Sequence, residues 1–360
     1  MDEQKCYHRR LKRFDAKCYA AFKGARHPYA AGYEKRKAHL VSIQEKDLTM
    51  KKKKTQKILV PVDGSDRGLN TVRYVTRSKA FLNVDIVLFH VFSSVPEGYW
   101  DLEKDPRSTS TVRQVKPWEV QQRKRIEQFM EQARQFLLKA GFSSKSIITK
   151  IQNRKKGIAR DIIREARNGY VAVVTRRRGL TVLRRIILGS VATKLVEKLT
   201  FVPLILVGKR SPNKKILLAF DGSENAARTV GFVGSLLGGL DYELSLFHVI
   251  RSNGDGLPEH QQILSPKEYS KFVRKEMASL LNAAQTELIN AGFKANKVST
   301  QITAKALSRA GAIADRAKQE NFGTIVIGRR GHSRVRDFFI GRVTNKVIHM
   351  ARDRTVWVIR

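Results

Sequence analysis

The chain has 360 residues, a hydrophobic fraction of 42% and a formal net charge of +38 at pH 7. This length and composition are typical of two globular domains and exclude a chain that is disordered throughout. No apolar run is long enough to cross a bilayer and no apolar signal core stands near the start, so we expect a cytoplasmic protein without a membrane partner. The positive charge predicts attraction to polyanions such as nucleic acid, nucleotides or anionic lipid, but a generally basic, solvated surface explains it equally well.

Residues 1–54 form a basic extension without sustained hydrophobic periodicity. Both cysteines of the chain, Cys6 and Cys18, lie in it, so a disulfide framework is excluded for the remainder. His8 and His27 lie nearby, but their spacing fits no standard zinc pattern. Two interpretations stay open: the extension is a disordered arm that contacts anionic partners, or translation starts at Met50 and the natural protein lacks the preceding residues.

The rest of the chain is a duplicated domain. The segment K-I-L-V-P-V-D-G-S at 57–65 returns 158 residues later as K-I-L-L-A-F-D-G-S, and Phe89-His90-Val91 returns at the same offset. Gly179 and Gly189 return at an offset of 152, as Gly331 and Gly341. A constant register with a single slip indicates duplication. We therefore predict one domain at 55–208, a linker at 209–213 and a second domain at 214–360, and so short a linker favours two domains packed side by side.

Within each copy, short apolar runs alternate with helical stretches, which is the pattern of a parallel sheet covered on both faces. In the first copy we expect strands at 57–62, 84–91, 146–151, 171–175 and 203–207. The helices between them are predicted at 66–80, 118–140, 158–167 and 191–198. In the second copy the strands are predicted at 215–220, 243–250, 297–303, 324–328 and 355–359. Its long helix is predicted at 266–291, with Ser265 as the cap and Pro266 in the first position.

One acidic residue ends the first strand of each copy. Asp63 and Asp221 stand at the carboxyl edge, where open α/β sheets bind their ligands. A carboxylate there can accept hydrogen bonds from ribose hydroxyls or from an adenine amino group. The alternative role is structural, because an aspartate can hold the turn formed by D-G-S.

A glycine motif follows the fourth strand of each copy and opens a helix. It reads Gly328-Arg-Arg-Gly331, nine residues and Gly341-Arg342-Val343 in the second copy. The first copy has Arg176-Arg-Arg-Gly179, nine residues and Gly189-Ser190-Val191. Glycines allow a phosphate to approach the backbone, and a helix N-terminus adds main-chain amides and the positive end of the dipole. Ser190 either donates to a phosphate oxygen or caps its helix.

Together these motifs resemble the universal stress protein family in its tandem form, over residues 55–360. The resemblance implies two Rossmann-like (adenine nucleotide alpha hydrolase-like) domains, each a five-stranded parallel sheet with helices on both faces, and strand pairing between 204–207 and 356–359. It implies that ATP, with Mg²⁺, binds at the carboxyl edges. The family aspartate corresponds to Asp63 and Asp221, and the valine that contacts adenine corresponds to Val91 and Val249. The residues that contact phosphate correspond to Gly179, Gly189, Ser190, Gly328, Gly331 and Gly341, with Val191 and Val343 following in the first helical turns.

Neither copy matches the family motif completely. Arg176 replaces the first glycine of the motif, and Arg342 replaces its serine or threonine. A Cβ at a glycine position blocks both close approach and special backbone angles, so Arg176 is expected to impair the first site. At Arg342 the helix amides remain, so we expect nucleotide binding in the second copy if only one site binds. The neighbouring arginines are expected to favour an anionic ligand in both copies: Arg177, Arg178, Arg184, Arg185, Arg329, Arg330, Arg334 and Arg336.

No catalytic signature accompanies these motifs. The sequence has no Walker A motif, H-E-x-x-H, nucleophile elbow or CxxC. His90 and His248 lie inside apolar strands, where a structural role is expected, and no metal site is predicted. We therefore expect no dedicated enzyme, and slow ATP hydrolysis at most.

The sequence supports one leading hypothesis and one alternative. The leading hypothesis is a stress-response sensor or adaptor whose two domains form an internal pseudo-dimer, with possible further homodimerisation, and bind adenine nucleotide in at least one half. The alternative is a basic interaction module for nucleic acid or an acidic protein that has lost nucleotide binding.

Overall fold

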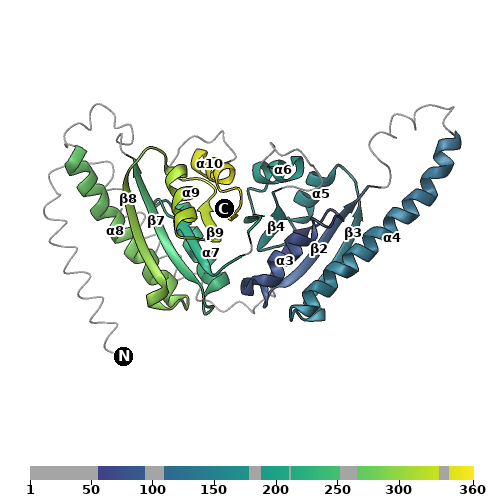
Figure 1. Ribbon diagram of the computed structural model, residues 1–360, viewed down its shortest axis with the longest axis horizontal. Helices are drawn as coiled ribbons and strands as arrows, with labels where there is room; N and C mark the ends of the chain where they lie inside the picture. The colour runs from purple at the N-terminus through teal and green to yellow at the C-terminus, as the bar shows by residue number, and fades with distance from the viewer. Residues whose placement is uncertain (1–55, 94–108, 178–187, 211, 252–265, 332–339) are drawn as a thin grey trace. The chain divides into compact units, whose positions relative to one another are not determined.

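The computed structural model describes residues 56–93, 109–177, 188–210, 212–251, 266–331 and 340–360. Its centre is one ten-stranded sheet with the order β3-β2-β1-β4-β5-β10-β9-β6-β7-β8 (Figure 1). The strands of the first repeat are β1 (Lys57–Pro61), β2 (Asp85–Phe92), β3 (Ile147–Asn153), β4 (Ala172–Arg176) and β5 (Leu204–Val207). Those of the second are β6 (Lys215–Ala219), β7 (Glu243–Arg251), β8 (Val298–Ala306), β9 (Thr324–Gly328) and β10 (Thr355–Ile359).

Each half of the sheet contains five strands that pair in parallel, in equivalent order. The halves join where β5 and β10 pair antiparallel, with Trp357 opposite Ile205. The central strands are buried on both faces, which explains why they read as continuous apolar runs rather than as alternating ones. The fold class is therefore confirmed: two Rossmann-like α/β repeats lie in tandem.

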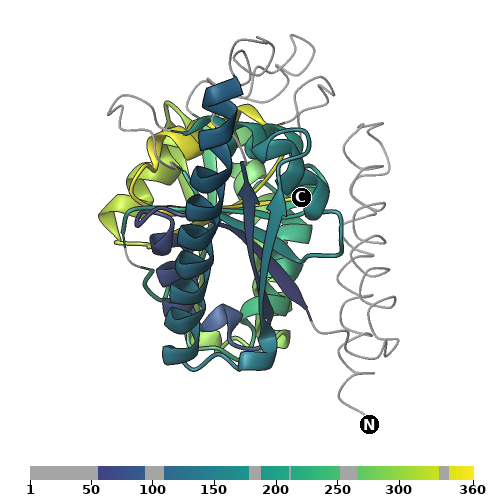
Figure 2. The same ribbon diagram turned by 90° about the vertical axis from the view of Figure 1, so that its right-hand side faces the viewer.

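Helices cover both faces of the sheet. The helices fall into two groups according to the buried apolar cluster to which they contribute. One cluster includes residues of α3, α4, α7 and α8, and the other includes residues of α5, α6, α9 and α10. The long helix α4 runs along β2 and β3 in both views (Figures 1 and 2). The first repeat contains α3 (Leu69–Arg77), α4 (Thr109–Lys139), α5 (Ile158–Glu165) and α6 (Ser190–Lys198). The second contains α7 (Glu224–Leu237), α8 (Pro266–Asn290), α9 (Arg309–Gln319) and α10 (Arg342–Met350).

Two helix predictions need correction in the first repeat. The helix expected at 66–80 is shorter, because the Gly68 amide is held by the Ser65 carbonyl and hydroxyl in a turn before α3 begins. In addition, α4 begins at Thr109, nine residues earlier than expected, and continues through Pro117. We expected a loop before residue 118 because Pro96, Gly98 and Pro106 stand in the preceding segment, and these residue types favour loops. The predicted strand boundaries agree with those of the structure within a few residues.

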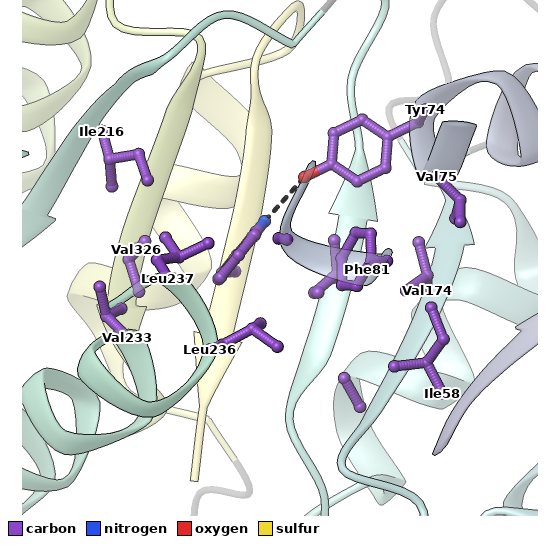
Figure 3. Packing of buried hydrophobic residues seen from close by; sticks show 14 of the residues in the cluster. Ile58, Tyr74, Val75, Phe81, Val174, Ile216, Val233, Leu236, Leu237 and Val326 are labelled. Atoms are coloured by element: carbon purple, nitrogen blue, oxygen red, sulfur yellow. Dashed lines mark hydrogen bonds between the residues drawn. The ribbon is translucent and has the colours of Figure 1, made fainter. Parts of the chain in front are cut away.

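The contact between the repeats has an aromatic centre. Trp357 on β10 is almost fully buried, and its indole Nε1 donates to the hydroxyl of Tyr74 on α3 at 3.0 Å (dashed line in Figure 3). Its ring lies 6.4 Å from that of Phe81 and 6.3 Å from that of Phe232. Burial raises the pKa of Tyr74, so this hydroxyl stays neutral and polar at every physiological pH. Helix and strand residues from both repeats therefore share one apolar core.

Within the described part of the chain, no helix is long and apolar enough to span a membrane. The basic extension, with Cys6, Cys18, His8 and His27, lies outside the described residues, as does Ser265.

Candidate functional site

The carboxyl edge of the second repeat brings Asp221 and its glycines together. Gly331 lies so near Asp221 that an added Cβ would fall well under 3.0 Å from the carboxylate oxygen Oδ2. An added Cβ at Gly328, the last residue of β9, would meet the Arg330 carbonyl at 3.3 Å and Asn225 Cβ at 3.4 Å. These close approaches explain why glycine occupies both positions. Asn225 was not anticipated from the sequence, and its amide donates to the Arg330 carbonyl at 3.0 Å.

The helix that begins at this edge has a glycine cap. Gly341 caps α10, and its amide donates to the Arg329 carbonyl at 2.9 Å. In the first repeat Gly189 caps α6 and donates to the Arg177 carbonyl at 2.7 Å. Both glycine amides are therefore used within the fold, contrary to their expected availability to phosphate. The amides that precede the helical hydrogen-bond ladder belong to residues 342–344 and 190–192.

Ser190 has a different place from the one expected for a cap. It is the first residue inside α6 and is exposed, and the cap is Gly189, without a side-chain hydrogen bond. The capping role proposed for Ser190 is therefore wrong. Arg342 occupies the same exposed first position in α10, followed by the half-buried Val343, just as Val191 follows Ser190.

Both strand-end aspartates hold their turns. The amide of Ser65 donates to Asp63 Oδ1 at 3.1 Å, and that of Ser223 donates to Asp221 Oδ1 at 3.0 Å. In the first repeat the Ser65 hydroxyl also donates to Asp63, at 2.6 Å. In the second repeat Ser223 instead caps α7 by accepting from the Ala226 amide at 3.2 Å. The structural role is thus present in both copies, and it leaves Asp221 Oδ2 directed at Gly331.

Two buried histidines donate hydrogen bonds to the residues that precede these turns. Nδ1 of His90 lies 2.9 Å from the Val62 carbonyl, and Nδ1 of His248 lies 2.8 Å from the Phe220 carbonyl. A carbonyl only accepts, so each Nδ1 carries the proton. Burial lowers the pKa of His90, although the Val62 carbonyl and Asp63 act in the opposite direction. The expected structural role is confirmed, and it is specific: each histidine fixes the residue before the site aspartate.

The first repeat has an arginine across the equivalent edge. Arg176 stands where the second repeat has Gly328, and its guanidinium donates to the Arg67 carbonyl, where the second repeat has Asn225. Burial lowers the pKa of Arg176, and the Asp63 charge offsets part of that effect. The side chain therefore bridges the ends of β4 and the turn after β1. Gly179 lies outside the described residues.

The candidate adenine-contacting valines are almost fully buried. Val91 and Val249 are 6% and 4% exposed and belong to the apolar cluster beneath α5, α6, α9 and α10. The registers of β1 with β2 and of β6 with β7, continued by two residues, place Val91 level with Asp63 and Val249 level with Asp221.

Two arginines of the glycine loops face the opposite repeat rather than a ligand. Arg177 Nη2 donates to the carbonyls of Ala351 and Arg354, both at 3.0 Å, and Nη1 donates to Ile348. Arg329 donates to the carbonyls of Leu199 at 3.1 Å, Glu197 at 2.9 Å and Val196. Each guanidinium thus satisfies carbonyls at the C-terminus of the last helix of the other repeat, where a positive charge also complements the helix dipole.

These two arginines correct the expectation that they attract an anion. Both side chains are buried, and burial lowers the pKa of each to about 10, so both remain charged at neutral pH. Their main chains meanwhile hold Gly189 and Gly341. Each residue therefore joins the glycine loop of one repeat to the helix end of the other. Arg178, Arg184, Arg185, Arg334 and Arg336 lie outside the described residues.

Among the described residues no group of acidic, histidine or cysteine side chains is arranged to hold a metal ion.

The fold and this edge define a tandem Rossmann-like protein with a glycine loop and a strand-end aspartate in each repeat. A family model of the universal stress protein family matches residues 54–207 and again 212–360. The chain belongs to that family and is therefore a stress-response protein.

The chain is also similar to solved structures. A universal stress protein from Archaeoglobus fulgidus DSM 4304 is 18% identical, with a TM-score of 0.54, over 84% of this chain and 95% of that one. The universal stress protein UspA from Lactobacillus plantarum is 20% identical, with a TM-score of 0.34, over 42% of this chain and 100% of that one. No curated protein matches the chain. At these identities the first likeness supports the fold alone.

Proposed function

We propose that this protein binds one adenine nucleotide, ATP with Mg²⁺, at the carboxyl edge of the second repeat. The observation that supports it is the convergence of Asp221, Gly328 and Gly331 beside the N-terminus of α10. The carboxylate oxygen Oδ2 offers an acceptor for ribose or adenine, and the two glycines keep side chains away from the space beside it. The first amides of α10 offer donors and a positive dipole end for phosphate.

The first repeat is proposed to bind nucleotide poorly or not at all. There Arg176 stands at the position of Gly328, and its guanidinium is already engaged by the Arg67 carbonyl. A stoichiometry of one nucleotide per chain follows. Nucleotide occupancy would change the surface at this edge, and the protein would act as a cytoplasmic sensor or adaptor, with the two repeats serving as an internal pseudo-dimer.

Isothermal titration with ATP and Mg²⁺ tests this proposal on the full chain. Wild-type protein should bind close to one equivalent, and Gly331→Val should abolish that binding because its Cβ cannot coexist with the present position of Asp221 Oδ2. Gly311→Ala is the matched control: its Cβ would make only ordinary contacts, the nearest at 3.5 Å, inside α9. Absence of ATP binding by wild-type protein, or unchanged binding by Gly331→Val, would refute the proposed site.

A further inference from the structure

The first repeat carries a row of basic side chains that the second repeat lacks. Five exposed residues form this row, here called the basic face: Lys155, Lys156, Arg160, Arg164 and Arg167. Two of them precede α5 and the others lie on it or directly after it. Arg160, Arg164 and Arg167 are spaced i, i+4 and i+7, which places them on one side of a helix.

The acids in this segment are directed inward. Asp161 is 1% exposed and Glu165 is 6% exposed. The Asp161 carboxylate accepts from the Lys155 amide at 2.8 Å and from the Lys156 amide at 3.3 Å. It therefore fixes the loop that presents these two lysines, and it also pairs with Arg164 at 3.0 Å.

Glu165 is likewise engaged within the fold. It accepts from Lys150 Nζ at 2.6 Å and from the Tyr170 hydroxyl at 2.7 Å. Between residues 150 and 167 the outward-facing surface consequently has no exposed acid to neutralise the basic face. Loop and helix geometry hold the five cations together without pairing most of them.

The duplicated domain supplies an internal comparison. Strand pairing aligns Ile151 with Ile302, since each lies opposite the histidine of its repeat, and the helix caps Gly157 and Ser308 keep that register. The residues equivalent to the basic face are then Ala306, Leu307, Gly311, Asp315 and Lys318. Five positive charges in one repeat correspond to one positive and one negative charge in the other. A general excess of basic residues would not produce this difference.

We propose that the basic face binds the phosphate backbone of nucleic acid. Guanidinium groups recognise phosphate oxygens in a bidentate manner, and a row of them suits a regular array of phosphates. A membrane-docking surface would also need apolar and aromatic side chains to insert, whereas Ile158 is the one large hydrophobic residue exposed between described residues 150 and 167. Protein–protein interfaces have a largely apolar core, while nucleic-acid interfaces are polar and strongly positive, as this face is. The inference does not depend on nucleotide binding by the second repeat.

The test compares two variants of the full chain that lose the same charge. One replaces Lys155, Lys156, Arg160 and Arg164 with Gln. The control replaces four exposed bases of the second repeat with Gln: Lys271, Arg274, Lys275 and Lys294. Fluorescence anisotropy with labelled 20-base-pair DNA and RNA duplexes, between about 50 and 200 mM salt, measures affinity and salt dependence. Thermal melts of both variants verify that each is folded.

The expected result is a loss of affinity of at least about tenfold for the basic-face variant at low salt, against less than about threefold for the control. The slope of log affinity against log salt should also flatten by about 3 to 4, because each lost phosphate contact contributes about 0.9. Equal losses in both variants, or no loss in either, would overturn the proposal. The proposal would also fail if the duplexes bound the wild-type protein and both variants equally well. In that case, a loss of binding to a polyglutamate peptide by the basic-face variant alone would assign the face to an acidic protein, and a loss of binding to phosphatidylserine vesicles would assign it to a membrane.

Discussion

The two sheet edges of this protein descend from one domain, yet their chemistry differs at two facing positions. In the second repeat Gly328 lies beside Asn225, whose side chain stays local and donates to Arg330. In the first repeat the Arg176 guanidinium donates to the carbonyl of Arg67, and the charge of Asp63 offsets part of the lowering of its pKa by burial. The second edge thus has a glycine beside an asparagine where a guanidinium crosses the first. Duplication allows the two edges to diverge in this way.

The buried arginines of the same loops show the opposite behaviour. Arg177 and Arg329 occupy equivalent positions and make equivalent contacts across the repeats. The interface has therefore kept its twofold relation where the ligand edges have diverged. This contrast indicates that joining the repeats is a requirement shared by both loops.

Exchanging the residues at the diverged position should have the largest effect. Gly328→Arg should weaken ATP binding by about 100-fold, about 2.8 kcal/mol, because the guanidinium would occupy the open edge. Arg176→Gly should raise the stoichiometry toward two nucleotides per chain, the second bound more weakly. Isothermal titration measures both quantities. If Arg176→Gly leaves the stoichiometry at one, some feature of the first repeat other than Arg176 prevents binding there.

Removing a buried arginine should destabilise the joined repeats. Arg329→Met leaves three carbonyls at the end of α6 without their donor, so we expect a loss of about 2–4 kcal/mol in the free energy of unfolding. Arg177→Met should lose a similar amount because its contacts are equivalent. Urea denaturation measures both. The neighbouring Arg330→Met is the control and should change stability by less than about 0.5 kcal/mol, since its half-buried charge opposes that of Arg329. Losses as small as the control's would mean that water replaces these arginines.

The hydrogen bond between Trp357 and Tyr74 at the aromatic centre should make a smaller contribution to stability. Trp357→Phe keeps a ring on β10 but removes the 3.0 Å hydrogen bond to Tyr74, so we expect a loss of about 1–2 kcal/mol. Tyr74→Phe removes the same bond with little change in volume. Because both substitutions remove one interaction, the double variant should lose less than the sum of the two single losses. Strict additivity in urea denaturation would show that the bond contributes nothing to stability.

A smaller, pH-dependent effect should come from His90. Its pKa in the folded protein lies below its ordinary value of 6.5, mainly through burial, so folding favours the neutral ring. Its contribution is complete above pH 6.5 and is lost as the pH falls from there through the folded pKa. We therefore expect wild-type protein to lose more stability between pH 7.5 and 5.5 than His90→Gln does, by urea denaturation at both values. Some dependence should remain in the variant, because burial also lowers the pKa of His349. Identical losses would contradict the assignment.

The local pattern determined most of this fold. Short apolar runs identified the central strands such as β5 and β9, because a strand buried on both faces leaves that pattern in the sequence. Motif spacing identified the repeats and placed Gly189 and Gly341 at helix starts. The local pattern misplaced the beginning of α4, since Pro96, Gly98 and Pro106 favoured a longer loop before it. It also could not assign Ser190, because a cap and a first helical residue differ by one position.

Only the tertiary structure decided which residues face a ligand and which face the other repeat. Arg176, Arg177, Arg329 and Arg330 look alike in sequence, but one crosses a sheet edge and two are buried against helix ends 130 to 177 residues away along the chain. The inward direction of Asp161 and Glu165, which leaves the basic face without exposed acids, is set by hydrogen bonds with the Lys155 amide and the Lys150 side chain, and it appears only in the folded chain. A long charged side chain can reach several partners, and the chain that folds beside it determines which one it meets.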